Sequence, residues 1–199
     1  MTDRYSCSEL RHDLRADIEA YLDFAAEYAP DRRTAGKRLS ALLTPSVLAC
    51  LLYRLAHKLH RGGWKGAALA VARLNLSALR ASIAPASRIG PGLYIPHPGG
   101  IMFEGRAGRN LRLYSGASAT RHGVTPLHGG ELEATPVIGD DVSLGSKASL
   151  VGAITVGSGT RVGFNAVVER DLAPGSLVFS AHIRAHLVAA GPGEAARAS

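Results

Sequence analysis

The stretch "PVIGDDVSLGSKASLVGAITVGSGTRVGFNAVVERDLAPGS", residues 136–176, repeats with a period of six. Counting in sixes gives an unbroken aliphatic series: Ile138, Leu144, Leu150, Val156, Val162 and Val168. Glycine directly follows four of these six residues. Neither an α-helix nor an alternating β-strand repeats in this way. A six-residue unit suits one face of a parallel β-helix, in which a short strand turns a corner and the large apolar residue points into a prism.

A first array with the same period lies earlier in the chain. Counting in sixes gives Ile83, Ile89, Ile95, Ile101, Ala107 and Leu113. Because three faces complete one coil of about 18 residues, residues 83–118 predict two coils and residues 138–173 predict two more. The segment 119–137 has no period and is expected to leave the prism as a loop. We therefore expect a β-helix of about four to five coils over residues 83–186, with a flexible tail over residues 187–199.

The residues before the arrays have the apolar spacing of α-helices. Ser6 and Glu9 stand at capping-box spacing before an apolar helical face. A second helix is expected to kink or begin at Pro45 and to end at "RGG", and a third helix begins near Trp64. Residues 1–82 thus predict an α-helical N-terminal domain, and the expected fold class is an α + β-solenoid.

The composition, 46% apolar and 20% charged, is that of a globular protein. The net charge of +7 suits an anionic partner, but the basic residues are scattered and only 6% of residues are aromatic, which argues against nucleic acid. Cys7 and Cys50 have no metal-type spacing and are expected to be reduced and structural. The start "MTDRYSCSEL" lacks the features of a signal peptide, which predicts a cytoplasmic protein.

An apolar run at residues 48–59 raises the question of membrane contact. Arg54 and Lys58 interrupt the run, and it is shorter than the roughly 20 residues that cross a bilayer. A buried helix–helix interface is the preferred interpretation. Peripheral contact through an amphipathic hairpin rich in Arg, Lys and Trp is the less favoured alternative.

The stretch "LYIPHPGGIM", residues 93–102, holds one histidine at a stiff point of the backbone. His97 stands between two prolines, which fix their own φ, and precedes two glycines, which adopt backbone shapes that other residues avoid. Because Ile95 is an inward residue of the first array, His97 falls at a corner of the prism. It is either a positioned functional group or a structural histidine of a turn.

Together, "IAPASRIGPGLYIPHPGGI" and the second array resemble the hexapeptide-repeat acyltransferases of the serine acetyltransferase type, a branch that also includes saccharide O-acetyltransferases. The resemblance implies a left-handed coil, acetyl-CoA as the acyl donor and a small acceptor such as serine. A prism with its active site at a corner holds half a site per chain, which predicts a homotrimer. By the same resemblance, the helical domain could pair trimers into a hexamer.

Within this resemblance, His97 matches the catalytic histidine, a general base that takes the proton of the acceptor hydroxyl. The residues that match the donor site are Gly145, Lys147, Ala148, Arg161 and Ala166. Lys147 and Arg161, with Arg184, supply cations that suit the phosphates of CoA. The residues expected to bind the acceptor are Ser82, Glu104, His122 and His128.

Two acids of the family are absent around the catalytic histidine. Ser82 stands where the family has the aspartate that orients the histidine, and Pro96 replaces the acid beside it. Glu104, or a loop carboxylate such as Glu131 or Glu133, is expected to substitute as the orienting group. The missing acids also make a saccharide or another hydroxylated or amino metabolite an alternative acceptor.

The loop departs from the family as well. Thr120 and Arg121 replace a glycine pair, and Thr135 stands at the position of the family's loop histidine. His122 and His128 are the possible replacements for that histidine.

Two further functions stay open. One is a non-catalytic hexapeptide-repeat scaffold or binding protein, which the missing aspartate and the altered glycine pair favour. The other is a zinc carbonic anhydrase, a class that also uses left-handed β-helices. Ligands on one face should then be separated by multiples of about 18 residues, whereas His97 and His122 are 25 residues apart. We therefore expect no metal.

Overall fold

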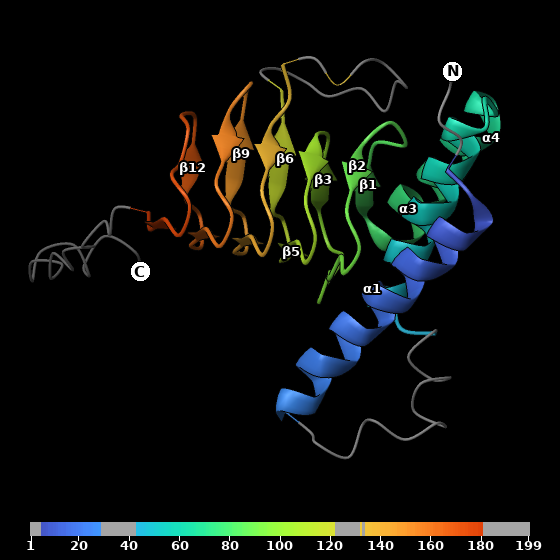
Figure 1. Cartoon of the computed structure of the whole chain (residues 1–199), viewed down its shortest axis with the longest axis horizontal. Coiled ribbons are helices and arrows are strands. Elements are labelled where there is room, and N and C mark those ends of the chain that lie inside the picture. The colour runs from blue at the N-terminus through green and yellow to red at the C-terminus, as the bar shows by residue number, and fades with distance from the viewer. Residues whose placement is uncertain (1–4, 29–42, 122–131, 133, 181–199) are drawn as a thin grey trace, which may run out of the picture.

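The computed structural model describes residues 5–28, 43–121, 132 and 134–180. Helices pack together at one end, and short strands stack beyond them as the coils of a β-helix (Figure 1). The helices are α1 (Cys7–Tyr28), α3 (Pro45–Arg61) and α4 (Lys65–Leu79). The predicted class, an α + β-solenoid, is confirmed.

The strands form three parallel sheets, one for each face of the prism. Sheet A contains β1 (Ala81–Ile83), β3 (Ile101–Phe103), β6 (Ser118–Thr120), β9 (Ser149–Val151) and β12 (Val167–Val168). Sheet B contains β2 (Arg88–Ile89), β4 (Arg106–Ala107), β7 (Val137–Ile138) and β10 (Thr155–Val156). Sheet C contains β5 (Arg112–Leu113), β8 (Ser143–Leu144), β11 (Arg161–Val162) and β13 (Leu177–Val178).

The helices begin where the sequence places them. The Ser6 amide donates to Glu9 Oε2 at 2.6 Å and the Glu9 amide donates to Ser6 Oγ at 3.1 Å, which completes the predicted capping box. Pro45 begins α3 rather than kinking a longer helix, and the Thr44 hydroxyl caps the first turn by accepting from the Val47 amide.

The period of six places the apolar core correctly in the second array. All six of its counted residues are at most 4% exposed and face the inside of the prism. In the first array, five of the six counted residues are buried and Ala107 is half-buried. The core therefore runs continuously along the axis of the β-helix.

The register of the first array differs from the even count of 18 residues per coil. Ile83 pairs with Phe103, 20 residues further on, and Phe103 pairs with Ala119, only 16 residues further on. The corner before β3 is thus two residues longer than expected and the next corner two residues shorter. Phe103, not Ile101, holds the inward column of sheet A. The two changes cancel, so the count in sixes is in phase again at Ala107.

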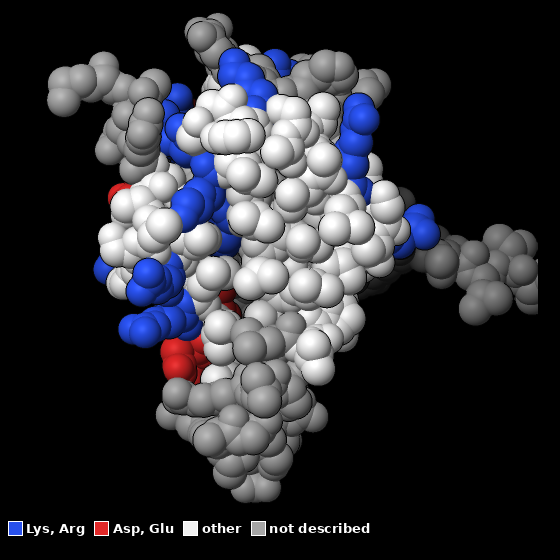
Figure 2. Space-filling view, turned by 90° about the vertical axis from the view of Figure 1, so that its right-hand side faces the viewer, with Lys and Arg blue, Asp and Glu red and all other residues white. Residues whose placement is uncertain are grey.

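The helices close one end of the prism, beside β1 (Figure 1). The face that this end turns outward is largely uncharged, with Lys and Arg along its sides (Figure 2). Among the described residues, no helix is long and apolar enough to cross a membrane. The predicted tail, residues 187–199, and most of the predicted loop lie outside the described residues.

Candidate active site

The chain passes from sheet C to sheet A through the corner of residues 96–100, which we call the His97 corner. It lies between Ile95 and Ile101, both fully buried, so its ends are fixed by the core. The His97 side chain is exposed, and its ring takes part in no hydrogen bond or ion pair with the part of the chain that the structure describes. The imidazole is therefore accessible to a substrate or to a second chain.

Backbone hydrogen bonds hold the corner from both sides. The Gly100 amide donates to the Arg80 carbonyl at 2.9 Å, and Gly100 has φ +78°, a value that suits only glycine well. The Gly99 carbonyl accepts from the Gly116 amide and from the Ser115 hydroxyl, each at 2.8 Å. The histidine is thus exposed on a fixed backbone.

The same corner repeats in each coil with a residue at positive φ. Gly100, Gly116, Lys147 and Asn165 have φ values of 78°, 73°, 59° and 57° and follow one another along one edge of the prism. Neighbouring coils are about 4.8 Å apart, so the His97 corner and Lys147, two coils further on, are separated by about 10 Å. The exposed Lys147 therefore lies along the edge that His97 begins.

The predicted donor residues divide into two groups. Gly145 and Lys147 lie on this edge, and Arg161 is exposed on the outer face of sheet C. Ala148 and Ala166 are buried inside the prism, and their amides donate within their own corners, to the carbonyls of Gly145 and Gly163. Of the five, only Lys147 and Arg161 have exposed side chains that a ligand can reach, and the roles of all five residues stay predictions.

The predicted acceptor residues do not converge within one chain. Ser82, half-buried, pairs with Met102 on sheet A and lies two residues after Arg80, whose carbonyl accepts a hydrogen bond from the His97 corner. Glu104 lies at the opposite end of β3, roughly 13 Å further along the strand. It is therefore too far from the ring of His97 to orient it in the same chain.

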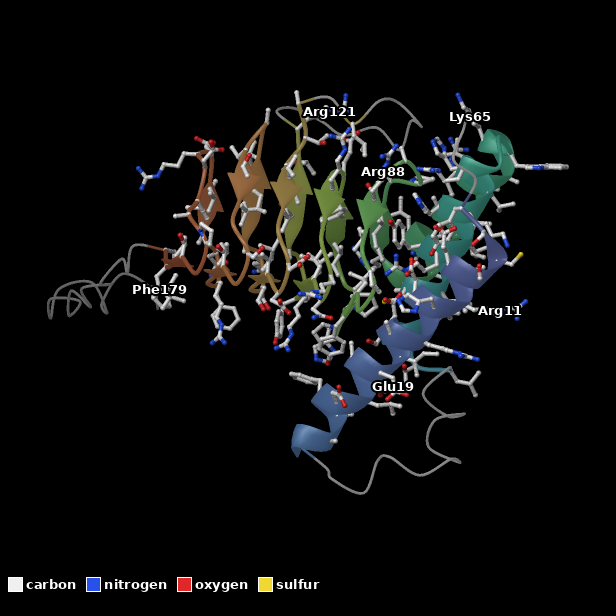
Figure 3. All side chains as sticks on the ribbon, viewed as in Figure 1. Arg11, Glu19, Lys65, Arg88, Arg121 and Phe179 are labelled. Atoms are coloured by element: carbon white, nitrogen blue, oxygen red, sulfur yellow. The ribbon has the colours of Figure 1, made fainter. Side chains whose placement is uncertain are left out.

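Glu104 is instead engaged in an ion pair. Its carboxylate is 2% exposed and receives Arg121 Nε at 3.1 Å and a second, shorter bond from Nη2 of the same guanidinium. This bidentate pair raises the pKa of Arg121 further above its usual value. Figure 3 shows Arg121 at the end of β6, the central strand of sheet A. The residue that replaces a family glycine is thus a partner of the residue proposed to bind the acceptor.

The loop residues predicted for the site, His122, His128, Glu131 and Glu133, lie outside the described residues, as does Arg184. Thr135 is buried and donates its hydroxyl to the Leu132 carbonyl at 2.8 Å. Among the described residues, no three His, Cys, Asp or Glu side chains gather as they would around a metal ion.

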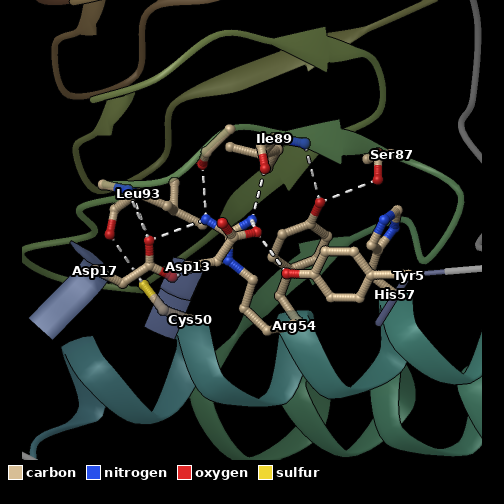
Figure 4. A network of polar contacts seen from close by, with 12 residues as sticks. Tyr5, Asp13, Asp17, Cys50, Arg54, His57, Ser87, Ile89 and Leu93 are labelled. Atoms are coloured by element: carbon tan, nitrogen blue, oxygen red, sulfur yellow. Dashed lines mark hydrogen bonds and ion pairs between the residues drawn. The ribbon is translucent and has the colours of Figure 1, made fainter. Parts of the chain in front are cut away.

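A buried network beneath the first coil was missed by the sequence analysis (Figure 4). Asp17 of α1 accepts from the amides of Gly92 and Leu93 at 3.0 and 2.7 Å. Arg54 of α3 donates to both carboxylate oxygens of Asp17 at 2.9 Å and to Asp13 at 3.2 Å. The signals were present: two acids spaced i, i+4 on α1 and one arginine within an apolar run.

The same network binds the strand that leads to the His97 corner. Arg54 also donates to the carbonyls of Ile89 and Gly90, at 2.5 and 2.7 Å, and the Ser46 hydroxyl donates to the carbonyl of Ile95 at 2.5 Å. Side chains of α1 and α3 therefore fix residues 89–95, two residues short of His97.

A hollow next to this strand is the other candidate place for a ligand. The Tyr94 ring packs on Phe24 of α1, with centroids 4.8 Å apart. The residues that line the hollow are Ala20, Asp23, Phe24, Gly92, Tyr94, Asn110, Arg112 and Asp141. Acidic and basic side chains both line it, and one lining residue, Tyr94, lies three residues before His97.

Comparison with known proteins gives a consistent result, although no family model matches the sequence. The chain is 36% identical over 144 residues to a serine acetyltransferase of Helicobacter pylori strain J99, covering 70% of this chain and 80% of the relative. It is 31% identical over 167 residues to a serine acetyltransferase of Mycobacterium tuberculosis, covering 83% and 68%. The crystal structure of a Neisseria gonorrhoeae serine acetyltransferase matches with a TM-score of 0.74 and 26% identity, and the match covers 88% of this chain and 66% of that one.

Proposed function

The chain belongs to the serine acetyltransferase family, and we propose that it transfers an acetyl group from acetyl-CoA to a hydroxyl group of serine or of a related small metabolite. The observation that carries the proposal is the exposed imidazole of His97 on a corner whose backbone is held by hydrogen bonds. Histidine is the side chain most often used as a general base.

In the proposed reaction, His97 accepts the proton of the acceptor hydroxyl while the hydroxyl oxygen attacks the thioester carbonyl. The C–O bond forms, the C–S bond breaks, and the proton passes from the imidazole to the departing CoA sulfur. No acyl-enzyme is needed. A general base contributes about 10² to 10⁴ in rate, and the alignment of two substrates supplies much of the rest.

The donor is proposed to lie along the edge from the His97 corner to Lys147. The ammonium group of the exposed Lys147 supports this placement, because a cation on the edge can pair with CoA phosphates. Arg161, on the adjacent face, is the second cation near this path.

The acceptor is less closely defined than the reaction. Serine carries an ammonium group that an acid would bind, and the two family acids near His97 are replaced by Ser82 and Pro96. This replacement favours the alternative of a saccharide or natural-product acceptor, O- or N-acylated by the same base. The hollow lined by Asp23 and Arg112 can hold either a zwitterion or a polar hydroxylated compound.

A homotrimer is proposed as the active form. The side chain of His97 is exposed, and sheet A, which the chain enters from this corner, has an uncharged outer face, in contrast to the arginines of sheet B. The outward residues of sheet A are Ser82, Met102, Ser118, Ser149 and Val167. Light scattering of the purified chain should give three times the mass of one chain, or six times if trimers pair.

The test of the proposed function is thiol release from acetyl-CoA against a panel of serine, homoserine, amino sugars and neutral sugars. We expect release with at least one hydroxylated acceptor and calorimetric binding of CoA. Release with sugars alone would move the assignment to the alternative acceptor. Absence of both CoA binding and thiol release with every acceptor would leave the non-catalytic scaffold.

A further inference from the structure

The outer face of α3 and α4 is apolar and exposed. Leu51 and Leu55, one turn apart on α3, are 36% and 40% exposed, and Leu74 on α4 is 55% exposed. Trp64, between the two helices, is 70% exposed. The sequence analysis preferred a buried helix–helix interface for this run, but the helices bury only their inner faces, which include Tyr53. We call this surface the helical outer face.

Its surroundings are strongly basic. From residue 32 to residue 103 the sequence contains eleven Lys and Arg and neither Asp nor Glu. The described cations of this segment that lie on or beside the two helices and outside the Asp17 network are Lys58, Arg61, Lys65, Arg73 and Arg80. Figure 2 shows the uncharged centre of this end with Lys and Arg on both sides. The acids visible in that view lie on its left side, and the largest group of them is directly below the Lys and Arg there.

This pattern selects among possible occupants. A second copy would bring two cation-rich rims together, and α3 and α4 have no acid with which to pair. An anionic bilayer complements both the apolar centre and the basic rim of the face. Leu and Trp insert at the boundary of the acyl chains, and Lys and Arg are attracted to the anionic headgroups. Stable attachment to a membrane surface generally takes two such signals together, an apolar one and a basic one.

We propose that the helical outer face binds the surface of an anionic membrane peripherally. The attachment requires no spanning segment. It orients the molecule, because the face lies at the end of the prism where the first coil begins, and the His97 corner belongs to that coil (Figure 1). The proposal goes beyond acetyl transfer and is tested without it.

The experiment is flotation of the full chain with vesicles of phosphatidylcholine, alone or mixed with phosphatidylglycerol. We expect the chain to float with the anionic vesicles at least about tenfold more strongly, and less as salt rises. Leu55→Glu with Leu74→Glu should reduce the partition coefficient by about tenfold or more. Lys65→Gln and Arg73→Gln should each reduce it by about fivefold, the effect of one cation near the surface.

Controls separate membrane binding from folding and from self-association. Leu177→Glu places the same charge at an equally exposed leucine on the last coil, 60% exposed, and should leave flotation unchanged. Circular dichroism should give the same melting temperature for all variants, because every substituted side chain is exposed. Light scattering should give the wild-type mass for the Leu55/Leu74 variant.

Several results would overturn the proposal. If the wild-type chain floats with neither kind of vesicle, the helical outer face does not bind membranes. Flotation that survives Leu55→Glu with Leu74→Glu uses another part of the molecule. A variant mass that falls to half, with no flotation by the wild type, assigns the face to a second copy of the chain. Binding of RNA in place of vesicles, with the same residue dependence, assigns it to nucleic acid.

Discussion

The first coil and the later coils of the β-helix are held by different forces. The later coils, from β7 onward, are stabilised mainly by backbone hydrogen bonds between parallel strands and by a continuous aliphatic core. Their paired residues are regularly 18 positions apart in sequence. The first coil has a lengthened corner and depends on side chains of α1 and α3, above all Arg54 and Asp17. Regular coils build the scaffold, and the coil fixed by other elements carries the exposed histidine.

The largest expected effect is a loss of activity when the His97 corner in the first coil is changed. His97→Ala should lower kcat/KM by about 10² to 10⁴ with an unchanged melting temperature, because the lost side chain is an exposed base. Ser115→Ala, which removes a hydroxyl bonded to the same corner, is the matched variant and should retain most of the activity. Full activity in His97→Ala would refute the assigned base.

The second prediction concerns the buried network. Arg54→Met leaves two carboxylates beneath the first coil without their cation, and should lower the free energy of unfolding by about 3 to 5 kcal/mol. Arg109→Met removes an exposed pair with Asp140 between later layers of the prism and should cost less than about 1 kcal/mol. Urea unfolding of both variants measures the difference. Equal losses would mean that the network adds nothing special to the first coil.

Acid should loosen the first coil before the later ones. Burial lowers the pKa of His57 to about 4, and its Nδ1 lies 3.0 Å from the Pro85 carbonyl in that coil. Since the folded pKa is below the unfolded value of about 6.5, the unfolded chain binds more protons between these values. Stability should therefore fall as the pH drops from about 6.5 to 4, by up to about 3 kcal/mol.

Urea midpoints across that pH range test this expectation. His57→Gln should flatten the profile, and amide exchange should rise first around residues 85–93 rather than in residues 143–168. A profile of the same steepness in the variant would assign the acid sensitivity to other groups.

The smallest effect belongs to the other end of the same edge. Lys147 has φ +59°, a conformation that costs a residue with a side chain about 1 kcal/mol. Glycine avoids this cost, but it loses more conformational entropy on folding, which offsets part of the gain. Lys147→Gly should thus raise stability by roughly 0.5 kcal/mol while raising the KM for acetyl-CoA several-fold. In Gly116→Ala the new Cβ would lie 3.1 Å from Lys147 Cγ and must adopt φ +73°, so this variant should lose stability. An unchanged KM in Lys147→Gly would remove the lysine from the donor site.

Much of the fold could be read from the sequence because its signals are local. The capping box of Ser6 and Glu9 and the six-residue count lie within short stretches of chain. The count failed at Ile101 because a longer corner and a shorter one cancel, so the period looks unbroken where the coil is most irregular.

The site was less accessible because its contacts are not local. Arg54 and Asp17 are 37 residues apart in sequence and on different helices, so no spacing rule joins them. Glu104 and Arg121 were each singled out, yet their pairing depends on the stacking of β3 and β6. The family resemblance supplied the role of His97, which periodicity alone placed only at a corner.

One backbone hydrogen bond connects the helical domain to the His97 corner. Arg80 terminates α4 in a left-handed conformation, and its carbonyl accepts from the Gly100 amide of the His97 corner. This bond connects the last turn of the helix directly to the corner. The Gly100 amide proton is consequently a single-atom spectroscopic probe, whose chemical shift and exchange rate report both on what touches α4 and on what binds beside His97.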